Sequence, residues 1–202
     1  MVFQRQQIIP GFFEVYCGCM KSGKTKALID RIDGIHFRED GDHIFFKPKI
    51  DTRDETIHTR FGNLKFECNY IDSQNPSEML DASNNYKVIA IDEVMFFGEE
   101  LLKTIDIFRK KGKMILASGL DLDFKAEPFG IMPKILAFAD DVIKTHGTCE
   151  YKGCSDLANR TQRLINNEPA HYNEPLISIE GSENFESYEC RCLDHHYIPG
   201  KP

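Results

Sequence analysis

The sequence predicts an α/β fold in which a parallel β-sheet is covered by helices, followed by a small C-terminal metal-binding domain. Three observations support this prediction. A glycine-rich loop separates an apolar run from an amphipathic stretch near the N-terminus, further apolar runs alternate with helical patterns, and four of the seven cysteines lie in the last 54 of the 202 residues. We expect the first domain to comprise residues 1–147 and the second residues 148–202.

The glycine-rich loop has the spacing G-x-x-x-x-G-K-[ST], with Gly18, Gly23, Lys24 and Thr25 at its fixed positions. In this motif, the P-loop, backbone N–H groups surround phosphate oxygens, the lysine reaches the outer phosphates, and the threonine hydroxyl faces Mg²⁺. The context fits, because a strand is predicted before the loop and a helix after it. The predicted nucleotide-binding residues are Gly18, Met20, Lys21, Ser22, Gly23, Lys24 and Thr25.

The remaining elements follow from hydrophobic periodicity and from turn signals. The predicted strands are Phe12–Tyr16, His43–Lys47, Asn63–Cys68, Tyr86–Ile91, Lys113–Ser118 and Val142–Thr145. The predicted helices are Thr25–Ile32, Pro76–Leu80, Glu99–Lys111 and Glu127–Ala139. In the last helix, we expect Ile131, Ile135, Leu136 and Phe138 to be core residues. The alternation of strands and helices predicts a P-loop NTPase-like sheet with helices on both faces.

Two carboxylates, Asp92 and Glu93, directly follow the apolar strand Tyr86–Ile91. In P-loop proteins an Asp at this position orders Mg²⁺ opposite the threonine of the loop, here Thr25. Neighbouring residues on an extended chain face opposite ways, so Glu93 is predicted to be free to act as a general base. The alternative is that both acids only cap the helix Glu99–Lys111.

Composition excludes several functional classes. The formal net charge of −7 and the pI near 5.5 argue against a protein that binds nucleic acid through its backbone. No apolar run is long enough to span a membrane, and the N-terminus has no export signal. We therefore expect a soluble, cytoplasmic protein without a nucleic-acid or membrane partner.

The C-terminal cysteines and histidines form two groups. Cys149 and Cys154 are followed about forty residues later by Cys190, Cys192, His195 and His196. Thiolates together with an imidazole favour zinc over Mg²⁺ or Ca²⁺. We favour a structural zinc site made by Cys149, Cys154, Cys192 and His195, with Cys190 or His196 as possible substitutes. The alternative is a set of reduced cysteines packed in a core.

Together these motifs resemble the P-loop, zinc-containing (type II) family of thymidine kinases, over about residues 12–196. The segments that carry the resemblance are Gly18–Thr25, Lys47–Arg53, Ile91–Phe97, Gly119–Gly130, Arg160–Arg163 and Tyr188–Cys192. The segment Gly119–Gly130 is the most specific, because the P-loop alone would fit many NTPases.

The resemblance implies that ATP, with Mg²⁺ near Thr25 and Asp92, phosphorylates the 5′-hydroxyl of thymidine to give thymidine monophosphate. Glu93 would accept the proton of that hydroxyl. Because this chemistry depends on charge stabilisation, an additional cation is expected. By resemblance, Arg53 is the first candidate for this cation, which would act together with Lys24 of the P-loop. Arg163 is a weaker candidate for the same role. Both arginines could equally form surface ion pairs.

The resemblance also assigns the substrate site. Met20, Phe96, Leu120, Phe124 and Phe129 would form an apolar pocket for the base. Residues 164–187 would form the lasso loop of the family. The zinc site would pin this loop at its base, because the loop, with the stretch Asn166–Pro169, is too polar to order itself. The backbone from Ile177 to Ile179 would bind the thymine edge, and Tyr188 would contact the nucleoside. The family further suggests a homo-oligomer, a dimer or tetramer, and feedback inhibition by thymidine triphosphate.

Three features depart from the family pattern. Met95 stands where the family usually has Gln, the spacing between Cys149 and Cys154 is two residues longer than usual, and the stretch Gly181–Tyr188 is longer. Two other functions stay open. One is a kinase of another deoxynucleoside, such as deoxyuridine, and the other is a non-metabolic P-loop switch or a zinc-ribbon binder of nucleic acid.

Overall fold

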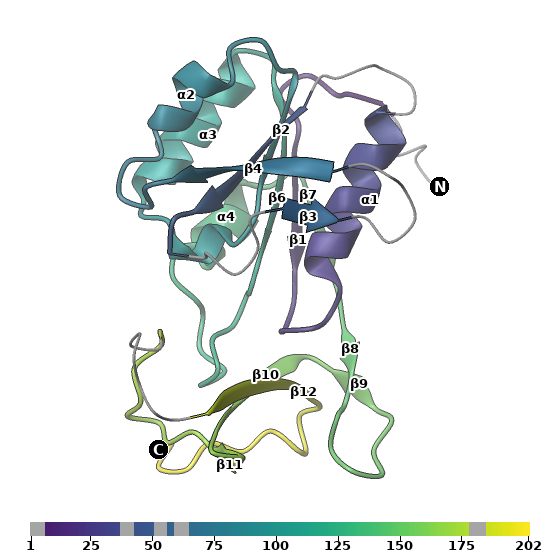
Figure 1. Cartoon of the computed structure of the whole chain (residues 1–202), viewed down its shortest axis with the longest axis vertical. Coiled ribbons are helices and arrows are strands. Elements are labelled where there is room, and N and C mark those ends of the chain that lie inside the picture. The colour runs from purple at the N-terminus through teal and green to yellow at the C-terminus, as the bar shows by residue number, and fades with distance from the viewer. Residues whose placement is uncertain (1–6, 37–42, 51–55, 59–64, 178–184) are drawn as a thin grey trace. The chain divides into compact units, whose positions relative to one another are not determined.

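The structure, a computed structural model, describes residues 7–36, 43–50, 56–58, 65–177 and 185–202 (Figure 1). The chain groups into two compact units. Unit 1 comprises Met1–Cys17, Lys24–Gly119 and Gly130–Ile143, and unit 2 comprises Gly18–Gly23, Leu120–Phe129 and Lys144–Pro202. The division at residue 147 stays a prediction. No helix among the described residues is long and apolar enough to cross a membrane.

Unit 1 is built on a mainly parallel sheet with the strand order β3-β4-β2-β5-β6-β1-β7. Its strands are β1 (Phe13–Cys17), β2 (His43–Pro48), β3 (Thr56–His58), β4 (Lys65–Ile71), β5 (Val88–Ile91), β6 (Met114–Gly119) and β7 (Asp141–Lys144). The pairs β4/β2, β2/β5, β5/β6 and β6/β1 are parallel, and β3 runs antiparallel to β4. The predicted parallel α/β fold is therefore confirmed.

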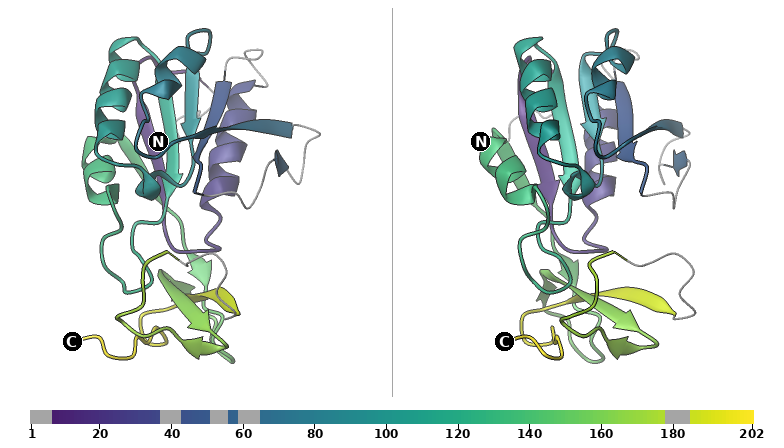
Figure 2. Two further views of the ribbon diagram at one scale, coloured as in Figure 1. Left: turned by 60° about the vertical axis from the view of Figure 1, so that its left-hand side comes forward. Right: turned by 90° about the vertical axis from the view of Figure 1, so that its left-hand side faces the viewer.

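Helices cover both faces of this sheet. They are α1 (Lys24–His36), α2 (Glu78–Ala82), α3 (Glu100–Lys110), α4 (Met132–Phe138) and the 3₁₀ turn η1 (Val94–Phe96). Helix α1 lies on one face, and α2, α3 and α4 lie on the other (Figures 1 and 2). On the α1 face, Leu28 and Ile32 pack against residues of β1, β2, β5 and β6. This layering explains why the central strands are continuous apolar runs.

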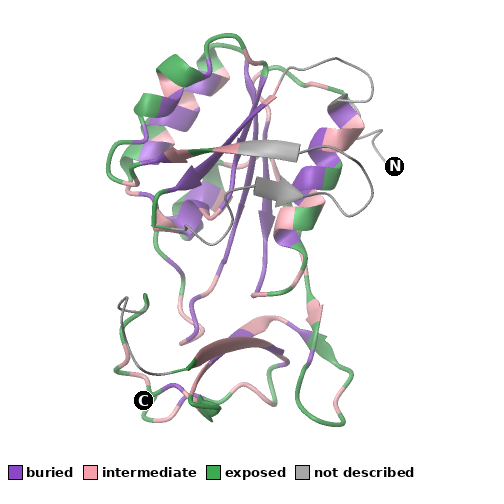
Figure 3. Cartoon of the chain, in the orientation of Figure 1, coloured by how far each residue is buried: buried purple, intermediate pink, exposed green. Residues whose placement is uncertain are grey.

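The sheet interior supplies the largest part of the hydrophobic core. Every residue of β5 and β6 is buried, as are the inward-facing residues of α3 (Figure 3). Burying one large aliphatic side chain contributes roughly 1.5–3 kcal/mol. The carboxyl ends of the parallel strands, where Asp92 follows β5, are therefore held on a rigid frame.

The predicted helix Glu127–Ala139 is shorter in the structure. Helix α4 begins only at Met132, because Gly130 adopts a left-handed conformation with φ of 51°. A Cβ on Gly130 would lie 2.3 Å from the backbone oxygen of Met95, so this turn requires glycine. Ile131 and Ile135 are buried as predicted, but Leu136 is only half-buried. The prediction for Phe138 is wrong, since the helix ends there and its side chain is 46% exposed.

Unit 2 contains two small antiparallel sheets, which the sequence did not predict. One has the order β11-β10-β12 and the other pairs β8 with β9. The strands are β8 (Gly147–Thr148), β9 (Leu157–Ala158), β10 (Arg160–Ile165), β11 (Glu168–Pro169) and β12 (Glu186–Arg191). Strands β10 and β11 form a hairpin whose two-residue turn is Asn166 and Asn167, with φ of 53° and 67°. The first part of the predicted lasso loop therefore contains a regular hairpin.

Candidate active site

The segment Gly18–Gly23 connects β1 to α1 through backbone conformations that favour glycine. Gly18 and Gly23 have φ of 144° and 85°, and Lys21 between them is also left-handed at 57°. A Cβ on Gly18 would lie 2.3 Å from the carbonyl oxygen of Thr145. The loop therefore has the tight, partly left-handed backbone geometry of a phosphate cradle.

Side chains of unit 2 hold this loop in place. Thr161 Oγ1 accepts a hydrogen bond from the Met20 N–H at 3.0 Å, and the Ser22 hydroxyl lies 2.8 Å from that of Thr145. The Lys21 ammonium pairs with Glu150 at 2.9 Å, and the thiol of Cys190 donates to the Met20 carbonyl at 2.8 Å. No local sequence pattern indicates these supports, because their partners lie more than 120 residues away from the loop in the chain.

In unit 1, the buried carboxylate of Asp92 organises the end of β5. Its Oδ2 accepts a hydrogen bond from the Thr25 hydroxyl at 3.1 Å. Its Oδ1 accepts one from the Glu93 N–H at 3.0 Å and a short one from the Ser118 hydroxyl. The structure thus brings together the two residues that the sequence assigns to Mg²⁺. A hydroxyl and a carboxylate are oxygen ligands of the kind that Mg²⁺ prefers.

Glu93 directly follows Asp92, but the two do not lie on an extended strand. Strand β5 ends at Ile91, and Glu93 has the left-handed backbone angles φ 54° and ψ 42° at the start of η1. The reason given from the sequence for the divergence of the two carboxylates, strand alternation, is therefore wrong. The left-handed turn sets the direction of Glu93 instead. A non-glycine residue in this conformation costs about 1–2 kcal/mol, and such strain clusters at functional sites.

Lys24 is the first residue of α1 and is buried at the carboxyl edge of the sheet. Sequence reasoning missed a second lysine in unit 1. Lys47, near the end of β2, is also buried, with its Nζ 4.0 Å from Asp92 Oδ2. Arg53, the predicted additional cation, lies outside the described residues.

The residues predicted to contact the base lie in both units. Phe96 is half-buried in η1 of unit 1. In unit 2, Leu120, Phe124 and Phe129 are buried and Met20 is half-buried. Phe124 packs with Ala170 and Ile198 in a hydrophobic cluster. Of the residues assigned to the nucleoside, Ile177 is 44% exposed, Tyr188 is half-buried on β12, and Ile179 lies outside the described residues.

The loop Leu120–Phe129 folds around Asp123. The Asp123 carboxylate accepts hydrogen bonds from the N–H groups of Lys125 at 2.8 Å and Glu127 at 3.0 Å. Burial raises the pKa of this carboxyl, although the two backbone donors oppose that effect. These bonds give a stable shape to the segment that carries the most specific part of the resemblance.

Arg163, the weaker of the two cation candidates, is not a surface residue. Only 2% of Arg163 is exposed, and its guanidinium donates to Glu186 Oε1 at 2.6 Å and to the Pro175 carbonyl at 2.5 Å. It also lies over the Phe124 ring, 5.4 Å from its centroid. The alternative of a surface ion pair is wrong for Arg163, because its ion pair with Glu186 is buried on the arginine side. We interpret Arg163 as a packing residue that joins three segments of unit 2.

Replacing Arg163 with Met is expected to destabilise unit 2 by about 3 kcal/mol, because it leaves the partly buried Glu186 carboxylate without its cation. Hydrogen exchange of the β10 and β12 amides measures this change. Arg160→Met, on the same strand but only half-buried, is the matched control and should change protection by less than about 1 kcal/mol. Equal protection in both variants would contradict the packing role.

Met95, at the position where the family usually has Gln, is a core residue. It is 3% exposed, and its Sδ lies 3.3 Å from where a Cβ on Gly119 would be. A buried thioether in this place fills space without offering a strong hydrogen bond to Glu93. The departure from the family pattern is thus accommodated by packing.

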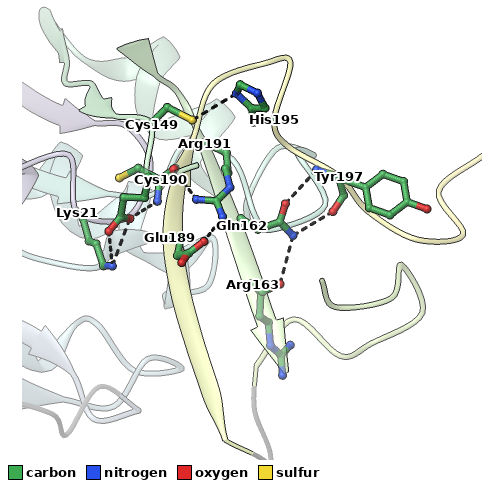
Figure 4. Close-up of polar contacts among 10 residues, drawn as sticks. Lys21, Cys149, Gln162, Arg163, Glu189, Cys190, Arg191, His195 and Tyr197 are labelled. Atoms are coloured by element: carbon green, nitrogen blue, oxygen red, sulfur yellow. Dashed lines mark hydrogen bonds and ion pairs between the residues drawn. The ribbon is translucent and has the colours of Figure 1, made fainter. Parts of the chain in front are cut away.

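In unit 2, Cys149, Cys154, Cys192 and His195 form a compact cluster. Their ligand atoms all lie within 4.8 Å of one another. His195 Nδ1 is 3.8 Å from Cys149 Sγ (Figure 4). The same nitrogen is 3.1 Å from Cys192 Sγ, and the ring stacks on Tyr151. Three thiols and one imidazole are a typical tetrahedral zinc set. The arrangement could hold a metal ion despite the irregular spacing of its first pair.

The cluster also favours deprotonation of one thiol. Burial acts to raise the pKa of Cys149, but hydrogen bonds from the backbone at Cys192 and Tyr151 and from the neighbouring thiols outweigh it and lower the pKa to about 7. Since a thiolate is the species that binds metal, Cys149 is prepared for that role.

Cys190 and His196, which the sequence left open as substitute zinc ligands, make other contacts. Cys190 donates to the Met20 carbonyl, and His196 donates from Nε2 to the Phe124 carbonyl at 3.0 Å. Burial lowers the pKa of His196, in keeping with a neutral ring that packs in the fold. Neither residue belongs to the cluster of four.

The P-loop, the sheet order and the Thr25–Asp92 contact define a nucleotide-binding protein of the P-loop NTPase class. A sequence model of the family described as thymidine kinase matches residues 11–197. A curated thymidine kinase of Coprothermobacter proteolyticus is 41% identical over 191 residues, which cover 95% of this chain and 93% of the relative. The chain belongs to the thymidine kinase family. Membership makes it an enzyme that phosphorylates a nucleoside, and a kinase of this family implies ATP and Mg²⁺.

Two solved structures have a weaker likeness. The flagellar accessory protein FlaH of Methanocaldococcus jannaschii matches with a TM-score of 0.49 and 14% identity, over 75% of this chain and 77% of FlaH. The pilus retraction motor PilT with bound ADP matches with a TM-score of 0.46 and 16% identity, over 78% of this chain and 48% of PilT. Neither likeness bears on the activity of this chain.

Proposed function

We propose that the protein transfers the γ-phosphoryl group of ATP to the 5′-hydroxyl of thymidine, giving thymidine monophosphate and ADP in nucleotide salvage. The observation that carries this proposal is the hydrogen bond between Thr25 and Asp92 at the carboxyl edge of the sheet, with Glu93 next in the chain. The 41% identity to a thymidine kinase supports thymidine as the nucleoside.

The residues divide into three roles in this proposal. The N–H groups of Gly18–Gly23 and the Lys24 ammonium bind the phosphates. Thr25 and Asp92 hold Mg²⁺, which when bound neutralises charge on the phosphates. Glu93 accepts the proton of the 5′-hydroxyl, whose oxygen bonds to the γ-phosphorus as the bond to the bridging oxygen breaks. Arg53 stays a candidate for additional charge stabilisation.

For the base pocket and the lasso loop, we propose the residues that the family resemblance assigns. We assign Met20, Phe96, Leu120, Phe124 and Phe129 to the base, with Ile177, Ile179 and Tyr188 from the lasso loop and its flank. Cys149, Cys154, Cys192 and His195 hold a structural zinc ion that fixes the base of that loop. We further propose that the protein is cytoplasmic and forms a homo-oligomer, either a dimer or a tetramer. Light scattering measures the oligomeric state.

A substrate panel tests the proposal directly. Purified protein with ATP and Mg²⁺ should phosphorylate thymidine with a kcat/KM at least about tenfold above that for deoxyuridine, since one additional methyl group in an apolar pocket is worth about 1–3 kcal/mol. A higher value for deoxyuridine would favour the alternative nucleoside. ATP consumption that is indifferent to any nucleoside would favour a nucleotide switch and contradict the kinase assignment.

A further inference from the structure

Two segments of unit 2 contribute both to the Cys/His cluster and to the support of the P-loop. Glu150 directly follows Cys149 of the cluster, and its carboxylate pairs with the Lys21 ammonium at 2.9 Å. Cys190 lies two residues before the third cysteine of the cluster, and its thiol donates to the Met20 carbonyl at 2.8 Å. All of these residues belong to unit 2. Each segment therefore carries a residue that contacts the P-loop within two positions of a cluster residue.

Glu150 and Cys190 are also bonded to each other. The N–H of Glu150 donates to the Cys190 carbonyl at 2.9 Å, and the N–H of Cys190 donates to Glu150 Oε2 at 2.6 Å. The oxygen nearer to the Lys21 ammonium is Oε1, at 2.9 Å against 3.2 Å for Oε2. The carboxylate of Glu150, a residue of the first segment, thus joins the backbone of the second segment to a side chain of the P-loop.

Lys21 has a backbone conformation that residues with a side chain disfavour. Its φ is 57°, in the left-handed region, between the positive φ angles of Gly18 and Gly23. A residue other than glycine persists in this region where its surroundings fix it, and such strain is frequent at ligand sites. The direction of the N–H groups in a phosphate cradle depends on these backbone angles. Contacts that hold Lys21 therefore also hold the cradle.

Stability alone gives the Lys21–Glu150 pair a small role. The two side chains are 52% and 37% exposed, and ion pairs at such exposure add little to the free energy of folding. Stability also gives no reason for a lysine at this position, because glycine would adopt the same backbone angles without strain. A role of the pair in fixing the shape of the loop accounts for both observations.

We propose that Glu150 is a positioning residue that couples the Cys/His cluster to the phosphate site. By holding Lys21, it keeps the N–H groups of the P-loop in the conformation that binds phosphate, and its bonds to Cys190 connect that conformation to the metal ligands. Nucleotide binding and the geometry of the metal cluster then influence one another, since a coupling between two sites acts in both directions. This inference rests on the proposed function for the identity of the nucleotide and of the metal.

The test uses the full chain with Co²⁺ in place of zinc, because Co²⁺ accepts thiolate and imidazole ligands and its tetrahedral sites absorb visible light. Glu150→Gln and Lys21→Met should each weaken the binding of MgATP about fivefold, and the double variant should bind no more weakly than either. Saturating MgATP should change the visible spectrum of the wild type but not that of the two single variants. Lys152→Met is the matched control, because Lys152 is exposed between the first two cysteines of the cluster, and it should behave as the wild type.

Several results would overturn the coupling. One is a wild-type spectrum that MgATP leaves unchanged. Another is tighter MgATP binding by Glu150→Gln, which would show that Glu150 only keeps Lys21 away from the phosphates. Losses that add up in the double variant would show that the two side chains act separately.

Two features keep the test decisive. Lys21→Met leaves both bonds between Glu150 and Cys190 in place, so it tests the same connection if Glu150→Gln does not fold. A wild-type protein that shows the spectral change but does not phosphorylate thymidine would contradict the proposed function and support the coupling.

Discussion

Glu93→Gln should lower kcat about 10³-fold while the affinity for ATP stays within about twofold, because the amide keeps the shape of the side chain but cannot accept the substrate proton. Gln also keeps the backbone N–H that donates to Asp92 Oδ1, so the Thr25–Asp92 arrangement should persist. Steady-state phosphorylation of thymidine measures the rate, and calorimetry measures ATP binding.

Glu99→Gln is the control for this experiment. Glu99 lies six residues further on, and its exposed side chain pairs with Lys134 on the surface. This pair should add little to stability and nothing to turnover. Near-normal turnover of Glu93→Gln would show that Glu93 is not the general base.

Cys192→Ser is expected to remove the bound zinc and to unfold most of unit 2. A structural zinc site contributes an apparent binding free energy of about 10–16 kcal/mol in zinc-finger peptides, so losing one thiolate ligand exceeds the stability that a small sheet has by itself. Elemental analysis should find one zinc per chain in the wild type and much less in the variant. Hydrogen exchange of the β10 and β12 amides should rise in parallel.

Cys190→Ser provides the matched control, because Cys190 lies on the same segment but outside the cluster of four. A serine hydroxyl can still donate to the Met20 carbonyl, so both zinc content and exchange should stay as in the wild type. The reverse pattern, with zinc retained in Cys192→Ser and lost in Cys190→Ser, would show that the ligand set is wrong.

Local patterns were sufficient to predict the sheet and the phosphate loop. The apolar runs before Asp92 and around Ala117 mark buried parallel strands, and the spacing of Gly18, Gly23 and Lys24 marks the loop. The contact of Thr25 with Asp92 also followed, because both positions have fixed places in such a sheet. The family membership predicted from these motifs is confirmed.

Other features could not be read from periodicity. The left-handed conformation of Glu93 depends on the turn into η1, and the support of the P-loop by Thr161 and Glu150 depends on the tertiary fold. No local pattern indicates that Lys47 is buried, because a lysine at a strand end is usually solvated. The hairpin at Asn166 and Asn167 did have a signal, because asparagine tolerates positive φ, and it was missed.

The supports of the P-loop have a consequence for synthesis of the protein. Met20 is held by Thr161 and Cys190, which are 141 and 170 residues further along the chain. A ribosome that adds about 5–20 residues per second therefore completes the loop many seconds before it completes these partners. During that interval the nascent chain should bind nucleotide weakly, and it should acquire this capacity only when its final strand has emerged.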